Sequence, residues 1–158
     1  MTIQIKPLTG SVAAAVTGVD LNQPLDDASF GILHWAVLVH GVLVFRGQHL
    51  QPAPQVALAR RWGKPVQGNP LLKGLTEFPE LAQVTKIPKE TASTEAWHSD
   101  SIYTEVPPKI SILWAVTIPV GGDTMWCNQY VSYDRLSPAM QRMIEGLRAR
   151  FSGARLAR

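Results

Sequence analysis

The sequence predicts an α+β fold that is mainly β, with helices at its flanks. Three patterns support this class: short apolar runs bounded by Gly and Pro, a nine-residue, mostly apolar run at residues 110–118, and apolar side chains at helical spacing in other regions. The chain has 158 residues, of which 46% are hydrophobic, so it is long enough to bury a core. We expect residues 1–158 to form one domain or part of one.

Short strands are expected near the N-terminus. Residues 3–6 and residues 13–19 are apolar runs separated by a turn at Thr9 and Gly10. Residues 42–45 form a third run of β-branched and aromatic type, which is typical of a buried strand.

Two helices are expected around that third strand. The first begins at an N-cap of Asp26 or Asp27 and ends at Gly41, because Asp favours N-caps and Gly favours the residue after a helix. The second begins at Pro52 and ends at Gly63.

Four further strands and a helix are expected in the second half. The strands are residues 81–86, a strand that begins at Trp97, residues 110–118 and residues 124–128, and the helix begins at Pro138. The run at 110–118 is the strongest strand signal, because its apolar character is typical of a central strand.

A His-x-Asp motif, His98 and Asp100, is the first candidate for chemistry. Alternate side chains of a strand point to the same face, so these two would project together, about 7 Å apart along the strand. An imidazole nitrogen and a carboxylate oxygen suit a borderline divalent metal, and with a second His they form the facial triad of non-haem Fe(II). The polar face of a surface strand would account for the same residues without a metal.

The His-x-Asp motif is one of a series of short motifs that follow one another along the chain. His98 and Asp100 are followed by Pro107-Pro108, the apolar run, and Gly121-Gly122-Asp123-Thr124. Further segments that carry the resemblance are Ile5-Lys6-Pro7-Leu8, Thr17-Gly18-Val19-Asp20-Leu21, Gly41-Val42-Leu43-Val44-Phe45-Arg46-Gly47-Gln48, Ala59-Arg60-Arg61-Trp62-Gly63, Tyr133-Asp134-Arg135-Leu136-Ser137 and Gly146-Leu147-Arg148-Ala149. In this order the chain closely resembles the taurine dioxygenase (TauD/TfdA) family of Fe(II)- and 2-oxoglutarate-dependent oxygenases, which include sulfonate, alkyl-sulfate and phenoxyacetate degraders.

The resemblance implies a role for three residues. His98 and Asp100 match the family's first two iron ligands, and Thr124 matches the hydroxyl that binds the distal carboxylate of 2-oxoglutarate. The family's third ligand, a His, and its carboxylate-binding Arg lie much further along, and residues 101–158 hold no counterpart. The remaining histidines, His34, His40 and His49, stand in no ligand motif.

The fold that the resemblance implies is a double-stranded β-helix, a distorted jelly roll flanked by helices. Residues 1–158 would form the N-terminal portion of a single TauD/TfdA-like dioxygenase domain, and the C-terminal strands that close the roll would be absent. Open strand edges favour aggregation or pairing with another chain, so we expect this chain alone to be poorly stable.

The implied reaction is hydroxylation of a small organic acid or sulfonate-type substrate with O2, with release of succinate and CO2 from 2-oxoglutarate. Tyr103, on the face expected for His98 and Asp100, and Thr94, four residues before the first ligand, are candidate walls of the substrate pocket. Taurine itself is disfavoured, because Thr94 stands where taurine-type members have Asn.

The composition of the chain indicates that neither nucleic acid nor a membrane is a partner. The formal charge of +3 is spread along the chain, and no basic-aromatic cluster indicates nucleic-acid binding. No apolar run is long enough for a membrane span, and the single Cys127 suits a reducing compartment, so a cytoplasmic location is expected. A homo-oligomer is compatible with the resemblance.

Two other interpretations stay open. The chain could be a non-catalytic remnant that acts as a binding or interaction module. It could also be a cupin-like protein that uses another metal and a water nucleophile, because His98 and Asp100 do not define the metal. With two of three ligands identified, the isolated chain is expected to be inactive under the oxygenase interpretation.

Overall fold

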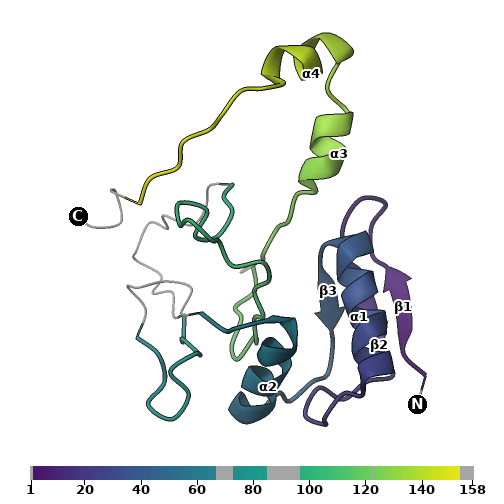
Figure 1. Ribbon diagram of the computed structural model, residues 1–158. Coiled ribbons are helices and arrows are strands. Elements are labelled where there is room, and N and C mark those ends of the chain that lie inside the picture. Colours follow the sequence, from purple (N-terminus) through teal and green to yellow (C-terminus); the bar gives the residue numbers. More distant parts are fainter. Residues whose placement is uncertain (1, 67–72, 85–96, 122, 154–158) are drawn as a thin grey trace. The chain divides into compact units, whose positions relative to one another are not determined.

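A computed structural model describes residues 2–66, 73–84, 97–121 and 123–153 (Figure 1). The chain divides into two compact units. Unit 1 comprises Met1–Pro54 and Trp114–Leu147, and unit 2 comprises Gln55–Leu113 and Arg148–Arg158. Each unit therefore combines an early segment with a late one.

Unit 1 is built on a three-stranded sheet in the order β1-β2-β3. The strands are β1 (Gln4–Pro7), β2 (Ala14–Thr17) and β3 (Leu43–Phe45). β1 pairs with β2 in the antiparallel sense, and β3 pairs with β2 in the parallel sense. All three expected N-terminal strands are confirmed. Ala14 and Val16 of β2 are buried, which is the alternation expected of a strand with one face on a core.

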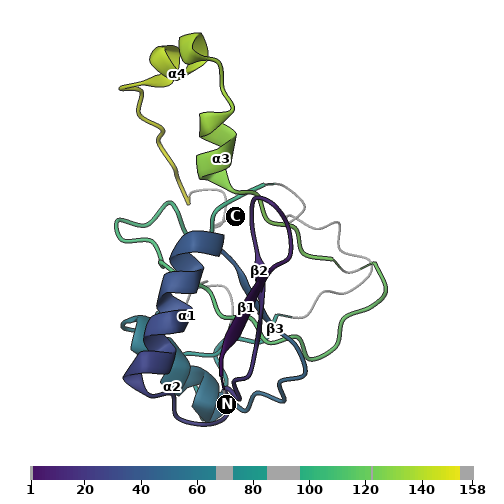
Figure 2. The ribbon, with the colours of Figure 1, turned by 90° about the vertical axis from the view of Figure 1, so that its right-hand side faces the viewer.

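Helix α1 (Asp27–His40) covers one face of this sheet (Figures 1 and 2). The side chain of Asp26 caps its N-terminus by accepting a hydrogen bond from the backbone N–H of Ser29 at 2.6 Å. Gly41 ends the helix with a φ of 70°, which an L-residue adopts only at a cost. Leu33 and Ala36 are the buried side chains of α1. Both expected helix boundaries are confirmed.

One side chain ties the segment after β2 to the segment after β3. The Oε1 of Gln48 accepts the backbone N–H of Leu21 at 2.9 Å, and its Nε2 donates to the carbonyl of Val19 at 3.1 Å. Leu21, whose N–H makes the first bond, and Leu50, two residues after Gln48, are both buried. The amide satisfies backbone groups that no strand pairs, so it fixes the loop that leads to α1.

Helix α2 (Pro52–Trp62) begins in unit 1 and runs through the start of unit 2. It carries two contacts within unit 2: Gln55 Nε2 donates to the carbonyl of Ile112 at 3.3 Å, and Arg60 pairs with Glu80 at 2.9 Å. An isolated antiparallel bridge between Gly74 and Ala82 closes the loop at 73–84. The expected helix from Pro52 is confirmed.

Two short helices lie in the late segment of unit 1. They are α3 (Gln129–Asp134) and α4 (Pro138–Ile144). The helix expected from Pro138 is confirmed, and α3 was not expected from the sequence. Asn128 caps α3 through its Oδ1, and its Nδ2 donates to the carbonyl of Ser11 at 2.7 Å. No helix among the described residues is both long and apolar enough to cross a membrane.

The prediction of strands after Glu80 was wrong for the residues that the structure describes. Residues 97–106, where a strand was expected from Trp97 to the break at Pro107-Pro108, form no strand, and neither do residues 110–118 or 124–128. Within the described part of 81–86 only Ala82 forms a bridge. Residues 85–96 lie outside the described residues. A strand exists only where a neighbour completes its backbone ladder, and no described segment pairs with 110–118. Helices therefore hold more of the described residues than strands do, so the fold is mixed α+β rather than mainly β.

Candidate functional site

The His98 and Asp100 side chains lie side by side in unit 2. His98 Nε2 is 3.3 Å from Asp100 Oδ1, and the two side chains are 54% and 65% exposed. The expectation that they project together is met, but a turn rather than a strand achieves it. The turn begins at Asp100, and Ser101 has a left-handed φ of 50°. Ser101 also accepts a hydrogen bond from the backbone N–H of Thr104 at 2.9 Å, which closes the turn.

A third polar side chain joins this pair. The hydroxyl of Ser111 donates to the second carboxylate oxygen of Asp100, Oδ2, at 3.4 Å. The bond is long, so it orients the carboxylate weakly. Ser111 was not among the site residues expected from the sequence. The signal was present, because Ser111 interrupts an otherwise apolar run from Ile110 to Val116.

The donor set suits one side of a metal site. Imidazole nitrogen and carboxylate oxygen each bind a divalent transition metal at about 2.1 Å, so two donors 3.3 Å apart fit two adjacent positions on one ion. No cluster of three or more His, Cys, Asp or Glu forms among the residues that the structure describes. Among these residues, His98 and Asp100 offer two donors of the types that bind such a metal.

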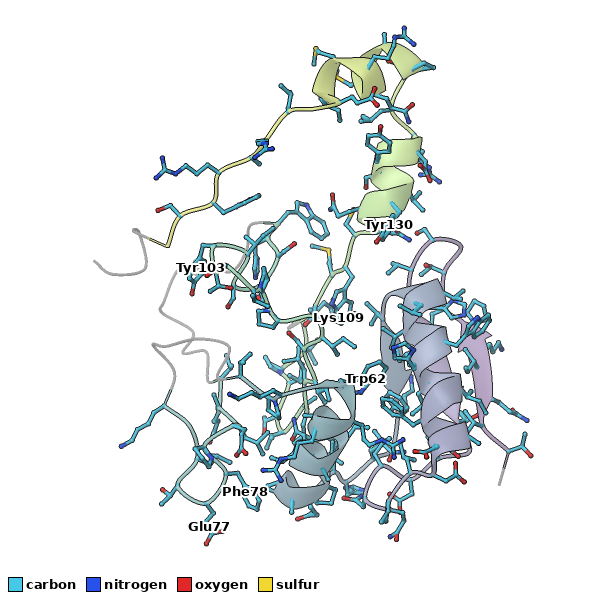
Figure 3. All side chains as sticks on the ribbon, viewed as in Figure 1. Trp62, Glu77, Phe78, Tyr103, Lys109 and Tyr130 are labelled. Atoms are coloured by element: carbon cyan, nitrogen blue, oxygen red, sulfur yellow. The ribbon has the colours of Figure 1, made fainter. Side chains whose placement is uncertain are left out.

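The other predicted site residues are distributed over both units. Thr124 is exposed in an irregular segment of unit 1. Tyr103 is half-buried in the turn that follows Asp100 (Figure 3). A β-carbon on Gly153 would lie 2.9 Å from the Tyr103 Cδ2, so Gly153 packs directly on the tyrosine ring. Thr94 lies outside the described residues.

Two carboxylates outside the site have shifted pKa values. The backbone N–H of Asn22 holds the pKa of Asp20 below its usual range. The backbone N–H of Glu80 itself and the guanidinium of Arg60 hold the pKa of Glu80 below its usual range. Both shifts come from hydrogen bonds that favour the charged form.

A shallow, open hollow lies on α3. It has a volume of about 280 Å³ and is lined by Gln129, Tyr130, Tyr133 and Asp134 of α3 (Figure 3). It holds neither His98 nor Asp100 and is bounded by one short helix. We therefore base the chemistry on the His98–Asp100 pair, where donor atoms of two ligand types meet.

Several known proteins are similar to this chain in sequence. Residues 4–158 match the family described as "Taurine catabolism dioxygenase TauD, TfdA family". The alkylsulfatase of Acinetobacter baylyi is 35% identical over 149 residues, which cover 92% of this chain and 45% of that protein. The (S)-phenoxypropionate/alpha-ketoglutarate-dioxygenase of Delftia acidovorans is 34% identical over 161 residues, which cover 96% of this chain and 55% of that protein.

A solved structure agrees with these relatives. The taurine dioxygenase of Burkholderia xenovorans superposes with a TM-score of 0.75 at 28% identity, over 97% of this chain and 56% of that one. The chain thus spans about half the length of the relatives that it matches. The match over residues 4–158 confirms the resemblance drawn from the motifs: the chain belongs to the TauD/TfdA family of dioxygenases.

Proposed function

We propose that this chain supplies the first two iron ligands of an Fe(II)- and 2-oxoglutarate-dependent dioxygenase. The observation that carries the proposal is the placement of His98 Nε2 3.3 Å from Asp100 Oδ1 in a chain of the TauD/TfdA family. The relative from Delftia acidovorans is named as an alpha-ketoglutarate dioxygenase, which supports 2-oxoglutarate as the co-substrate. The reaction converts substrate, O2 and 2-oxoglutarate to hydroxylated product, succinate and CO2.

Each residue has a separate task in this proposal. His98 and Asp100 hold the metal, and the negative charge of Asp100 offsets part of the ion's charge. Ser111 orients the free oxygen of Asp100. Thr124 donates its hydroxyl to a carboxylate of 2-oxoglutarate. Bound iron would supply the activation of O2, and the residues of this chain supply ligand position and charge.

The relatives' names support a proposal about the substrate class. The compounds in those names, alkyl sulfates, phenoxypropionate and taurine, each carry an anionic head group. We propose a small organic acid or a sulfonate- or sulfate-type substrate for this chain as well. Tyr103 and Thr94 are the proposed pocket residues.

The family also supports a proposal about the complete fold. We propose that residues 1–158 are the N-terminal portion of one double-stranded β-helix domain. Residues 110–118 would then become a central strand once partner strands complete the ladder. Within this proposal the chain taken alone turns over no substrate, because the residues described offer two metal ligands and no third. A cytoplasmic location fits the single cysteine.

A binding module without catalysis is the alternative function. The exposed apolar side chains of the 110–118 segment favour it, because such a segment can pair with another chain. Val116 is 76% exposed and Leu113 is 75% exposed. A chain retained for this role would need neither iron nor 2-oxoglutarate.

The DNA that follows codon 158, translated in every frame, distinguishes these functions. If the chain belongs to a dioxygenase, one translated frame should contain a His followed closely by an Arg. The protein extended through that frame should form succinate only when Fe(II) and 2-oxoglutarate are both present. His98→Ala should abolish that succinate formation, and the control His49→Ala should not, because His49 stands in no ligand motif. Absence of a His and Arg pair in every frame would contradict the dioxygenase and favour the binding module.

A further inference from the structure

Helix α2 is joined by a side-chain hydrogen bond to the segment that carries Ser111. Gln55, in the first turn of α2, donates from its Nε2 to the backbone carbonyl of Ile112 at 3.3 Å. Both residues of this bond are half-buried. They belong to unit 2, as His98 and Asp100 do. The bond therefore holds the backbone of this segment against a helix of the same unit.

The residue before Ile112 is Ser111, whose hydroxyl donates to Asp100 Oδ2 at 3.4 Å. Ile110 and Ile112 are half-buried, and Ser111, between them, is exposed. Successive side chains of an extended chain point to opposite sides of the backbone, and this alternation in exposure fits that rule. A backbone held at the carbonyl of Ile112 thus directs the Ser111 hydroxyl outward, where it contacts the carboxylate.

The contacts form a series that ends on the two metal-ligand candidates. Ser111 contacts one carboxylate oxygen of Asp100, Oδ2, and the other oxygen, Oδ1, lies 3.3 Å from His98 Nε2. The two oxygens of a carboxylate share one rigid plane. A hydrogen bond to Oδ2 therefore also sets the direction of Oδ1, the atom that faces the imidazole.

We propose that Gln55 is a positioning residue for the His98–Asp100 pair. By holding the backbone at Ile112, it keeps the Ser111 hydroxyl on Asp100 and so sets the direction of the carboxylate. This role rests on the proposed function, because the pair that Gln55 positions is the proposed pair of metal ligands. Groups that orient a ligand from outside the metal site commonly tune its affinity.

The lengths of the bonds set the size of the expected effect. The bonds made by Gln55 and Ser111 are 3.3 and 3.4 Å long, at the weak end of the range for hydrogen bonds. Gln55 acts through Ser111, so its loss should weaken metal binding no more than loss of the Ser111 hydroxyl does. We expect the Kd for a divalent metal to rise about twofold.

The first test is titration of the full 158-residue chain with Mn(II), followed by calorimetry. Gln55→Met keeps the length of the side chain and removes the donor, and Gln55→Asn keeps the amide but is too short to reach. Both should raise the Kd about twofold. Gln51→Met is the matched control, because Gln51 Nε2 donates to the carbonyl of His49 at 3.1 Å in unit 1. It should leave the Kd unchanged.

A double-mutant cycle separates positioning from a general effect on stability. If Gln55 acts through the Ser111 hydroxyl, Gln55→Met should raise the Kd in the parent chain and have no further effect in a Ser111→Ala chain. Independent, multiplied effects of the two substitutions would overturn the proposal. A rise in Kd of the same size in Gln51→Met would also overturn it.

The second test needs no metal. The chain has four histidines, and loss of one set of imidazole signals in His98→Ala identifies the His98 ring in NMR spectra. Gln55→Met should move the His98 signals in the parent chain and leave them in place in the Ser111→Ala chain. Unmoved His98 signals in Gln55→Met would overturn the positioning role. Moved signals in a chain that binds no Mn(II) would support that role and contradict the proposed function instead.

Discussion

His98 Nε2 lies 3.3 Å from Asp100 Oδ1, although no strand holds the two residues. The turn at Asp100 and Ser101 places both donors on one side of the chain. Local backbone geometry therefore assembles the pair within a span of three residues.

Loss of the Ser111 hydroxyl should weaken metal binding modestly. Ser111→Ala removes the bond to Asp100 Oδ2, so the carboxylate loses one of the groups that orient it. Because the bond is 3.4 Å long and exposed, we expect the Kd for a divalent metal to rise only about two- to threefold. Metal titration followed by calorimetry measures this change, and Ser11→Ala in unit 1 is the control. A loss as large as that of Asp100→Ala would mean that Ser111 itself binds the metal.

The lowered pKa of Glu80, caused first by its own backbone N–H and then by the guanidinium of Arg60, should make unit 2 sensitive to acid. The folded pKa of Glu80 is lowered, so its contribution to stability is fully present above the unfolded pKa of about 4.3 and is lost as pH falls through the lower folded value. Proteolysis of the 73–84 loop should therefore accelerate below about pH 4.3. Glu80→Gln should remove this part of the pH dependence, and added salt should reduce it, because both partners are partly exposed. An unchanged profile in Glu80→Gln would show that other carboxylates control the loop.

The cap of α1 should contribute measurably to the stability of unit 1. Asp26→Ala removes the acceptor for the backbone N–H of Ser29, and we expect the free energy of unfolding to fall by about 1 kcal/mol. Asp26→Asn keeps a capping oxygen and should retain most of that stability. Urea denaturation followed by circular dichroism compares the two variants. Equal losses in both would assign the effect to the charge of Asp26 rather than to its hydrogen bond.

Polar substitution in the 110–118 segment should improve solubility. Leu113→Lys and Val116→Lys replace side chains that are 75% and 76% exposed, so neither removes core packing. Charged residues on unpaired strand-forming segments block edge pairing. Light scattering at increasing concentration should show less aggregation for each variant than for the parent chain. If aggregation were unchanged, a surface other than the 110–118 segment would be responsible for it.

The elements that sequence reasoning located are those whose signals are local. The α1 boundaries follow from Asp26 and Gly41, because caps act within a few residues of the helix end. The His98–Asp100 pair was located for a similar reason, since its members are two residues apart. Helix α3 was missed because its cap, Asn128, lies within a run expected to be a strand.

The predictions that were wrong concern strands, which depend on pairing with segments far away in the sequence. Residues 110–118 have the composition of a central strand, but composition alone cannot form a ladder. The chain spans about half the length of its relatives, and strand pairing is the interaction most sensitive to which segments are present. The role of Thr124 in binding 2-oxoglutarate remains a prediction, because it was drawn from the match to the family's motif and not from a contact of its side chain.

Metal titration of four proteins tests the central claim most directly: the parent chain, His98→Ala, Asp100→Ala and the control His49→Ala. Fe(II) is added without oxygen, and binding is measured by calorimetry, with Mn(II) as a second probe. We predict one bound ion per parent chain, at least about tenfold weaker binding in each of the first two variants, and unchanged binding in His49→Ala. Equal binding by all four proteins, or no binding by the parent chain, would contradict the assignment of His98 and Asp100 as metal ligands.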